Sequence, residues 1–266
     1  MIIFYFDELF YIKVKENFLK KAIKALVMGL MCFAGNVFAN STNLNFILGS
    51  SFSQLSNKQY ISPTSGLINS YNSKESVQFR PFYGFGVEYD FDHITTQPIT
   101  FGLGLSFYYV DLGNISGIET PGVNILPPPP DTLTYKMQAK SSTILLEPKL
   151  IYTAFHLQPY IFGGVGYGWN SLSNFSEGTV PGSSATPSTS PYPNHTQTEF
   201  TYEAGLGLQY IFQECKNNRT IIFHIEYRYL NLGQSRLGTS AAQTTNDHIT
   251  VNNSTNVIDF GITYRL

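Results

Sequence analysis

The stretch Val77–Phe91, VQFRPFYGFGVEYDF, decides the fold because it alternates between two kinds of residue along its whole length. One set of alternate positions holds valine, aromatic residues and a proline. The other set includes Arg80, Gly84, Gly86 and Glu88. A period of two is the pattern of a β-strand whose two faces meet different surroundings.

Seven further segments repeat this alternation. In each, every second residue forms an apolar row, here called a ladder, that contains no charged residue. The segments are 44–52, 99–109, 144–152, 157–169, 202–210, 221–229 and 258–266. Typical ladders are Phe101-Leu103-Leu105-Phe107 and Ile221-Phe223-Ile225-Tyr227. The chain therefore predicts eight strands.

The opposite face of these strands is rich in glycine and carries isolated charges. An apolar and aromatic face against a small, charged face is the pattern of a transmembrane β-barrel, whose apolar side meets lipid and whose polar side lines the lumen. We therefore predict an all-β fold, an eight-stranded antiparallel up-and-down transmembrane β-barrel over residues 40–266. The lumen charge network predicted by parity comprises Arg80, Glu88, Glu147, Lys149, Glu203, His224, Glu226, Arg228, Asp259 and Arg265.

The connections between the predicted strands alternate in length. Segments 54–76, 111–134, 170–199 and 231–255 are long, whereas 92–97, 153–156 and 213–219 are short. This order places all long loops at one end of the barrel, as in outer-membrane barrels with short periplasmic turns and long external loops. The long loops are rich in Ser, Thr, Asn and Pro, so we expect a hydrated surface with little fixed structure.

Residues 1–39 have the three parts of a cleaved signal peptide. Five lysines, from Lys13 to Lys24, precede the apolar run Ala25–Ala34, and Val37-Phe38-Ala39 supplies small residues before a cut after Ala39. An uncleaved N-terminal anchor helix and a lipoprotein attached through Cys32 are the alternatives. If translation begins near Val14, the acidic residues Asp7 and Glu8 are not part of the protein.

Composition excludes several classes of protein. Of the 266 residues, 15% are aromatic and only 13% are charged, which argues against both a coiled coil and a disordered chain. The net charge of −2 offers no basic surplus for nucleic acid. Two cysteines, Cys32 and Cys215, are too few for a disulfide framework or for a zinc site. We expect no cofactor and no metal.

The last eight residues, DFGITYRL, resemble the terminal assembly signal of outer-membrane proteins, which the barrel-assembly machinery recognises. The matching positions are Asp259, Gly261, Tyr264 and Leu266. The family's final residue is usually Phe, and here it is Leu.

The segment Pro159–Gly168, PYIFGGVGYG, is similar to a central strand of the small eight-stranded outer-membrane barrels, the OmpA-like, OmpX-like and opacity-protein group. The resemblance covers residues 43–266. It implies residence in the bacterial outer membrane and contact with its lipid. It implies no single activity, because members of one fold serve many functions.

Catalysis is not expected, although the lesser alternative, a lipid A-modifying barrel enzyme, has to be weighed. The family's lipid A deacylases use a His-x-Ser pair, and none of the five histidines here precedes a serine by two residues. Only His224 lies on a predicted strand, and an inward serine such as Ser106 or Ser142 would have to reach it. A water-soluble lipocalin-type barrel, with the aromatic ladders inside, is a further alternative.

The sequence thus favours an integral outer-membrane protein with a structural role in the envelope and adhesin-like contacts, to a host or surface ligand, through its loops. The main alternative is a narrow porin-like channel. The balance of predicted inward acids and bases favours a filled lumen, since eight strands enclose only enough space for their own side chains.

Overall fold

The computed structural model describes residues 41–266 apart from 56–57, 75, 92–97, 126–130 and 215–219. The signal-peptide segment, the short turn 92–97 and most of the turn 213–219 lie outside the described residues. No helix in the described part is long and apolar enough to cross a membrane. The strands are β1 Ser41–Gln54, β2 Lys58–Thr64, β3 Leu67–Ser73, β4 Val77–Phe91, β5 Ile99–Thr120, β6 Leu133–Tyr152, β7 Leu157–Thr179, β8 His195–Glu214, β9 Thr220–Arg236 and β10 Thr250–Arg265.

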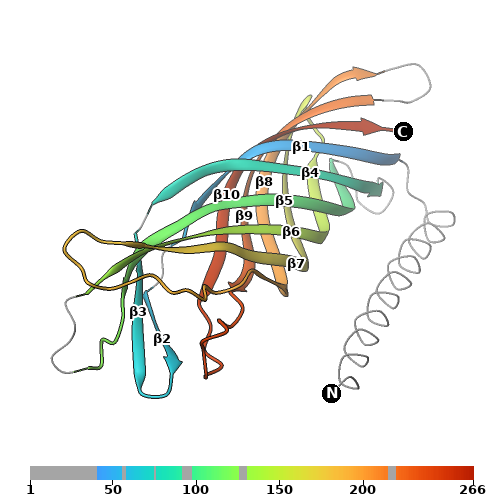
Figure 1. Ribbon diagram of the computed structural model, residues 1–266. Helices are drawn as coiled ribbons and strands as arrows, with labels where there is room; N and C mark the ends of the chain where they lie inside the picture. Colours follow the sequence, from blue (N-terminus) through green and yellow to red (C-terminus); the bar gives the residue numbers. More distant parts are fainter. Residues whose placement is uncertain (1–40, 56–57, 75, 92–97, 126–130, 215–219) are drawn as a thin grey trace, which may run out of the picture. The chain divides into compact units, whose positions relative to one another are not determined.

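Eight of these strands form a closed antiparallel ring. From β4 to β10 each strand pairs with the next, and β1 pairs with both β4 and β10 (Figure 1). At the seam Leu44 lies opposite Tyr264, and the Leu266 backbone N–H donates to the Thr42 carbonyl at 2.8 Å. Closure gives each strand a neighbour on both sides for its backbone hydrogen bonds, which lipid cannot supply. The predicted eight-stranded up-and-down architecture is confirmed.

The apolar ladders face outward and form a belt around the ring. Phe46, Phe79 and Phe260 are 62%, 67% and 63% exposed, values that an enclosed ligand cavity would not give. The lipocalin-type alternative, which places these rings inside, is therefore wrong.

The strands run well past this belt at the end where β5 ends and β6 begins, here named the long-loop end. β5 spans 22 residues and β7 spans 23, about twice the predicted lengths. Beyond the ring, the β2–β3 hairpin pairs with the last residues of β5, between Ser70–Ser73 and Gly117–Thr120. The expectation that the long loops have little fixed structure is therefore wrong for much of their length.

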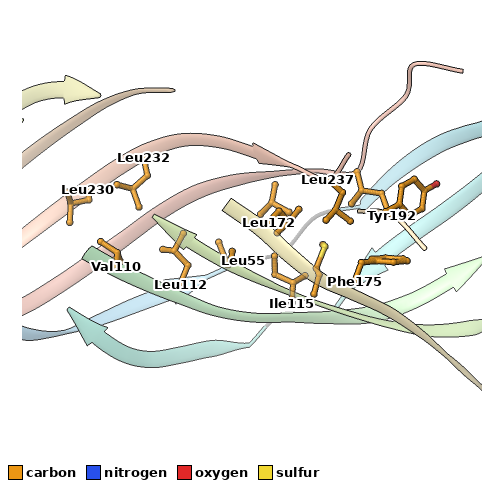
Figure 2. Close-up of a cluster of buried hydrophobic side chains, with 14 of the residues drawn as sticks. Leu55, Val110, Leu112, Ile115, Leu172, Phe175, Tyr192, Leu230, Leu232 and Leu237 are labelled. Carbon is orange, nitrogen blue, oxygen red and sulfur yellow. The ribbon is translucent and has the colours of Figure 1, made fainter. Parts of the chain in front are cut away.

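An apolar core inside the long-loop end explains this extension. Within the belt the inward residues include all the charged side chains of the network, whereas beyond it they are mostly apolar and fully buried. Figure 2 shows a cluster of these buried apolar side chains. The labelled members of this core are Leu55, Val110, Leu112, Ile115, Leu172, Phe175, Tyr192, Leu230, Leu232 and Leu237. The barrel is thus inverted in polarity along its axis: it faces lipid through the belt and encloses a core in the manner of a soluble β-protein beyond it.

Two bulges mark the change of polarity, and both have the sequence Asx-Leu-Gly. Gly113 and Gly233 take φ values of +93° and +77°, and each donates its N–H to the side chain two residues earlier, Asp111 or Asn231, at 2.9 and 3.0 Å. The register shifts beside them, between Asp111 and Gly113 and between Asn253 and Ser254. One extra residue moves the inward position from even to odd numbers.

Candidate functional site: the filled lumen

Glycines on the inner face give space to aromatic rings from neighbouring strands. Tyr160 lies over Gly207 and Phe162 over Gly205, so that a Cβ at either glycine would overlap the ring. Tyr108 lies in the same way over Gly84, and the imidazole of His224 over Gly261. Each ring lies across the directly paired glycine of the next strand and so packs along the inner wall of the lumen.

Arg228 is the centre of the lumen and is 1% exposed. Its Nε donates to Asp259 Oδ2 and its Nη1 to Glu203 Oε2, each at 2.9 Å, and its Nη2 donates to Glu226. Three carboxylates on three strands, β8, β9 and β10, therefore hold one guanidinium. Such charge-assisted bonds are the strong ones in a protein interior.

Aromatic rings complete the surroundings of Arg228. The guanidinium carbon lies 4.6 Å from the ring centroid of Tyr108, 4.9 Å from that of Phe162 and 5.5 Å from that of Phe82. Phe82 and Tyr108 stack on each other with centroids 5.1 Å apart. These rings separate the charged layer from the apolar core of the long-loop end.

A second ion pair lies on the opposite wall. Lys149 Nζ is 2.8 Å from Glu88 Oε2 and 4.7 Å from the ring centroid of Tyr160. The Tyr160 hydroxyl donates to Glu226 at 2.5 Å and so joins this pair to the Arg228 cluster. Glu147 accepts a hydrogen bond from Ser106 Oγ at 2.7 Å.

Nearer the opposite end of the barrel, here named the short-turn end, Arg265 pairs with Asp90. Asn43 also donates to Asp90, at 2.8 Å. Asp90 was not among the predicted lumen residues, although its position two residues after Glu88 places it on the same face.

Arg80 takes a different place from the one predicted. It donates to Gln78 Oε1 at 3.1 Å, and Gln78 in turn bonds the backbone of Asn114 at the long-loop end. The other nine predicted residues line the lumen. With Asp90 added, six carboxylates face three permanent cations, so the lumen has a surplus of acid; the cations are Lys149, Arg228 and Arg265.

The cavities reflect this filling. A polar vestibule of about 420 Å³ at the short-turn end is lined by residues that include Gln158, Gln209 and Arg265. Further in, a cavity of about 10 Å³ bordered by Glu88, His224 and Arg228 has room for about one water molecule. Beyond it lie the rings around Arg228.

His224 does not meet a serine among the described residues. Its Nδ1 lies 3.3 Å from Thr263 Oγ1 and its Nε2 lies 3.8 Å from Glu226 Oε1. Ser106 bonds Glu147, and Ser142 lies on the outward face of β6, between the buried Ser141 and Thr143. The expectation that Ser142 points inward is wrong.

The residues of the terminal signal divide between the two faces of β10. Asp259 and Gly261 point inward, to Arg228 and His224. Tyr264 lies opposite Leu44 on the outward face of the sheet, and Leu266 is 50% exposed.

A separate carboxylate cluster lies at the long-loop end, outside the belt. Glu119 is buried and accepts hydrogen bonds from Tyr71 at 2.9 Å and Asn69 at 3.0 Å. Burial, with the nearby carboxylate of Glu177, raises the pKa of Glu119 to about 7. Burial also raises the pKa of Tyr192, which neighbours this cluster.

Comparison with known proteins gives one sequence family. The family model described as "Outer membrane protein beta-barrel domain" matches residues 26–265. No curated protein matches the chain.

Among solved structures, Neisserial surface protein A has 11% identity and a TM-score of 0.41, over 85% of this chain and 96% of the other. OprG of Pseudomonas aeruginosa has 14% identity and a TM-score of 0.43, over 86% and 97%. Ail, the attachment invasion locus protein of Yersinia pestis, has 11% identity and a TM-score of 0.36 in its complex with the heparin analogue sucrose octasulfate, over 86% and 100%. The family assignment rests on the sequence match.

Proposed function

The chain belongs to the outer membrane protein β-barrel domain family, and from this premise we propose that it is a closed barrel that presents its long-loop end at the cell surface as a structural and adhesive platform. The protein resides in the bacterial outer membrane. The proposal concerns which end is displayed and what that end does.

One observation carries the proposal: the interior is filled at two successive levels. The belt holds the Arg228 network, and the long-loop end holds the apolar core around Leu112 and Leu232. Opening a path would break buried ion pairs and also expose a core, so transport through the barrel is disfavoured. What remains available for function is the outer surface.

The long-loop end is built as a fixed surface. The free edge of β2 is covered by the segment before β10, where Ser62 N–H donates to Asp247 Oδ2 and Thr244 N–H donates to the Pro63 carbonyl, each at 2.9 Å. Covering an edge strand prevents unspecific strand pairing. A hairpin held in this way can present side chains such as the 58%-exposed Tyr60 in one geometry.

The test is an adhesion assay on intact cells. Replacing Lys58–Ser73 by a short Gly-Ser linker should lower binding to host-cell and matrix-coated surfaces, whereas the same linker in place of 184–190 serves as the matched control. An epitope tag at Thr189 should be accessible on intact cells, and a tag at Phe155 should not. Equal binding by both variants at equal surface levels, or a surface-exposed Phe155 tag, would overturn the proposal.

The narrow-channel alternative has one observation in its favour, the vestibule of about 420 Å³ at the short-turn end. The vestibule leads toward the ion-pair network and not to a second opening among the described residues. Conductance measurements separate the two functions.

We also propose that Asp259, Gly261, Tyr264 and Leu266 act as the signal for the barrel-assembly machinery. Their support is the position of β10, which closes the ring against β1.

A further inference from the structure

The hydrogen bonds around His224 fix which of its ring nitrogens carries the proton. Asn45 uses its amide N–H to bond Glu88 at 3.3 Å, which leaves its Oδ1 as an acceptor. Thr263 donates its single hydroxyl proton to that Oδ1 at 2.7 Å, so toward His224 the hydroxyl can only accept. His224 Nδ1 therefore carries a proton, so that in the neutral ring Nε2 presents a lone pair.

This lone pair faces carboxylates and no donor among the described residues. The His224 side chain is 3% exposed, and its Nε2 has no hydrogen-bond partner there. Glu226 Oε1 lies 3.8 Å away, and Asp259 Oδ1 is also buried without a partner. One ligand atom from each of the three residues lies within 4.8 Å of the others. Three ligand atoms converge, and burial of such a group is stabilised by a cation or a proton shared between them.

Arg228 does not supply that charge at this point. It bonds Oε2 of Glu226 and Oδ2 of Asp259, which leaves Glu226 Oε1, shared with the Tyr160 hydroxyl, and Asp259 Oδ1 without a bond to the guanidinium. The lumen also holds more carboxylates than permanent cations, and this excess favours a bound cation.

We propose that His224, Glu226 and Asp259 bind one divalent transition-metal ion of the Zn²⁺ type. An imidazole nitrogen with two carboxylates is a ligand set for Zn²⁺ and its neighbours, whereas Ca²⁺ and Mg²⁺ prefer oxygen alone. Tetrahedral bonds of ~2.0–2.2 Å place donor atoms ~3.3 Å apart. The three side chains, whose ligand atoms lie within 4.8 Å of one another, would therefore draw closer around the ion. The fourth position would hold water.

The surroundings of the site suit this role. Thr263 orients the imidazole through Nδ1, as groups behind a metal ligand commonly do. Gly261 leaves the space in which the ring lies over β10. The ion has an entry route, because Gln209, which lines the short-turn vestibule, lies directly across from His224 in the β8–β9 register.

The experiment uses the full protein, purified without an affinity tag from membranes in detergent and stripped with chelator. Isothermal titration with Zn²⁺ at neutral pH should give one ion per chain and a higher unfolding temperature. Co²⁺ should give the visible absorption of a four-coordinate site. His224→Gln should weaken Zn²⁺ binding by more than about 100-fold, and Thr263→Val by about 10-fold, the usual effect of a group that orients a ligand.

Matched controls are His156→Gln, an exposed residue of the short turn 153–156, and the double variant His195→Gln/His248→Gln at the long-loop end. Both should bind Zn²⁺ like the unmodified protein. Absence of binding by the folded, unmodified protein would overturn the proposal and would mean that protons neutralise the cluster. Binding that survives His224→Gln but not the double variant would also overturn it.

Discussion

At the scale of the residue, Arg228 decides the stability of the lumen. Its removal would leave Glu203, Glu226 and Asp259 buried around a missing cation. Breaking a buried pair costs about 3–5 kcal/mol, much of it from the stranded partner. We expect Arg228→Ala to lower the free energy of unfolding in detergent by this order, as measured by urea titration.

A double-mutant cycle separates pairing from packing at Arg228. Glu226→Ala alone should also destabilise, and the double variant should be more stable than the sum of the single effects predicts, because Glu226 is then no longer left buried without its cation, although Glu203 and Asp259 still are. Strict additivity of the two effects would show that the pair makes no coupled contribution.

The glycines beneath the rings give a second prediction at this scale. Gly207→Ala would drive a methyl group into Tyr160, and overpacking of this kind costs about 1–3 kcal/mol. Gly104 also faces the lumen, but the nearest atom to an added Cβ there is 3.5 Å away, so Gly104→Ala is the matched control. Equal urea midpoints for the two variants would contradict the assigned role of Gly207.

Parity in the sequence placed most of the lumen residues, because a period of two leaves only one face for each position. It could not show which charges meet, since pairs such as Lys149 with Glu88 depend on where the ring brings distant strands together. Arg80 was assigned to the network because parity carries no information on depth along the barrel. The proposed metal ligands were missed because cysteine count, and not His224, guided the search for metal sites.

At the scale of the element, the bulges explain where the sequence analysis stopped. Up to Tyr109 and Tyr229 the ladders are regular, and then Asx-Leu-Gly shifts the parity by one residue. Beyond that point the outward positions are polar, as at Asn114, Ser116 and Gln234, so the continuing strands resemble polar loops. The two copies of the motif, at 111–113 and 231–233, are the signal in the sequence that could have revealed the extensions.

The docking of β3 on β5 should depend on pH through Glu119. Its folded pKa of about 7 exceeds the ordinary value of 4.5, so the folded state binds the extra proton, and stability falls as pH rises from about 4.5 through 7. The groups that face it are Glu177, Tyr71, Asn69 and Tyr192. The measurement is the exchange rate of the β3 amides in the unmodified protein divided by the rate in Glu119→Gln. We expect this ratio to be higher at pH 8 than at pH 5. A ratio independent of pH would contradict this assignment.

The last strand gives a prediction about assembly. Deleting Tyr264–Leu266 removes the short-turn end of the β1–β10 seam, and a barrel left open at one edge cannot persist in lipid. The truncated chain should accumulate in the periplasm, sensitive to protease, whereas Leu266→Phe should assemble at least as fast as the unmodified chain. Normal heat-modifiable gel mobility of the truncated form would argue against a role for these residues in closure.

At the scale of the whole described unit, residues 41–266 combine a lipid-facing belt with an enclosed core. The belt needs outward apolar residues and a satisfied polar interior, whereas the extension beyond it needs the reverse. The charged network and the apolar core therefore close the lumen by different means at successive levels. This double closure is the central claim, and it is the reason for assigning function to the surface.

Planar-bilayer conductance of the purified barrel tests that claim most directly. A filled lumen predicts current near background for the unmodified protein and for Arg228→Ala, because the apolar core remains when the ion pairs are lost. Steady, nanosiemens-scale openings in the unmodified protein would contradict the double closure and establish the narrow channel instead.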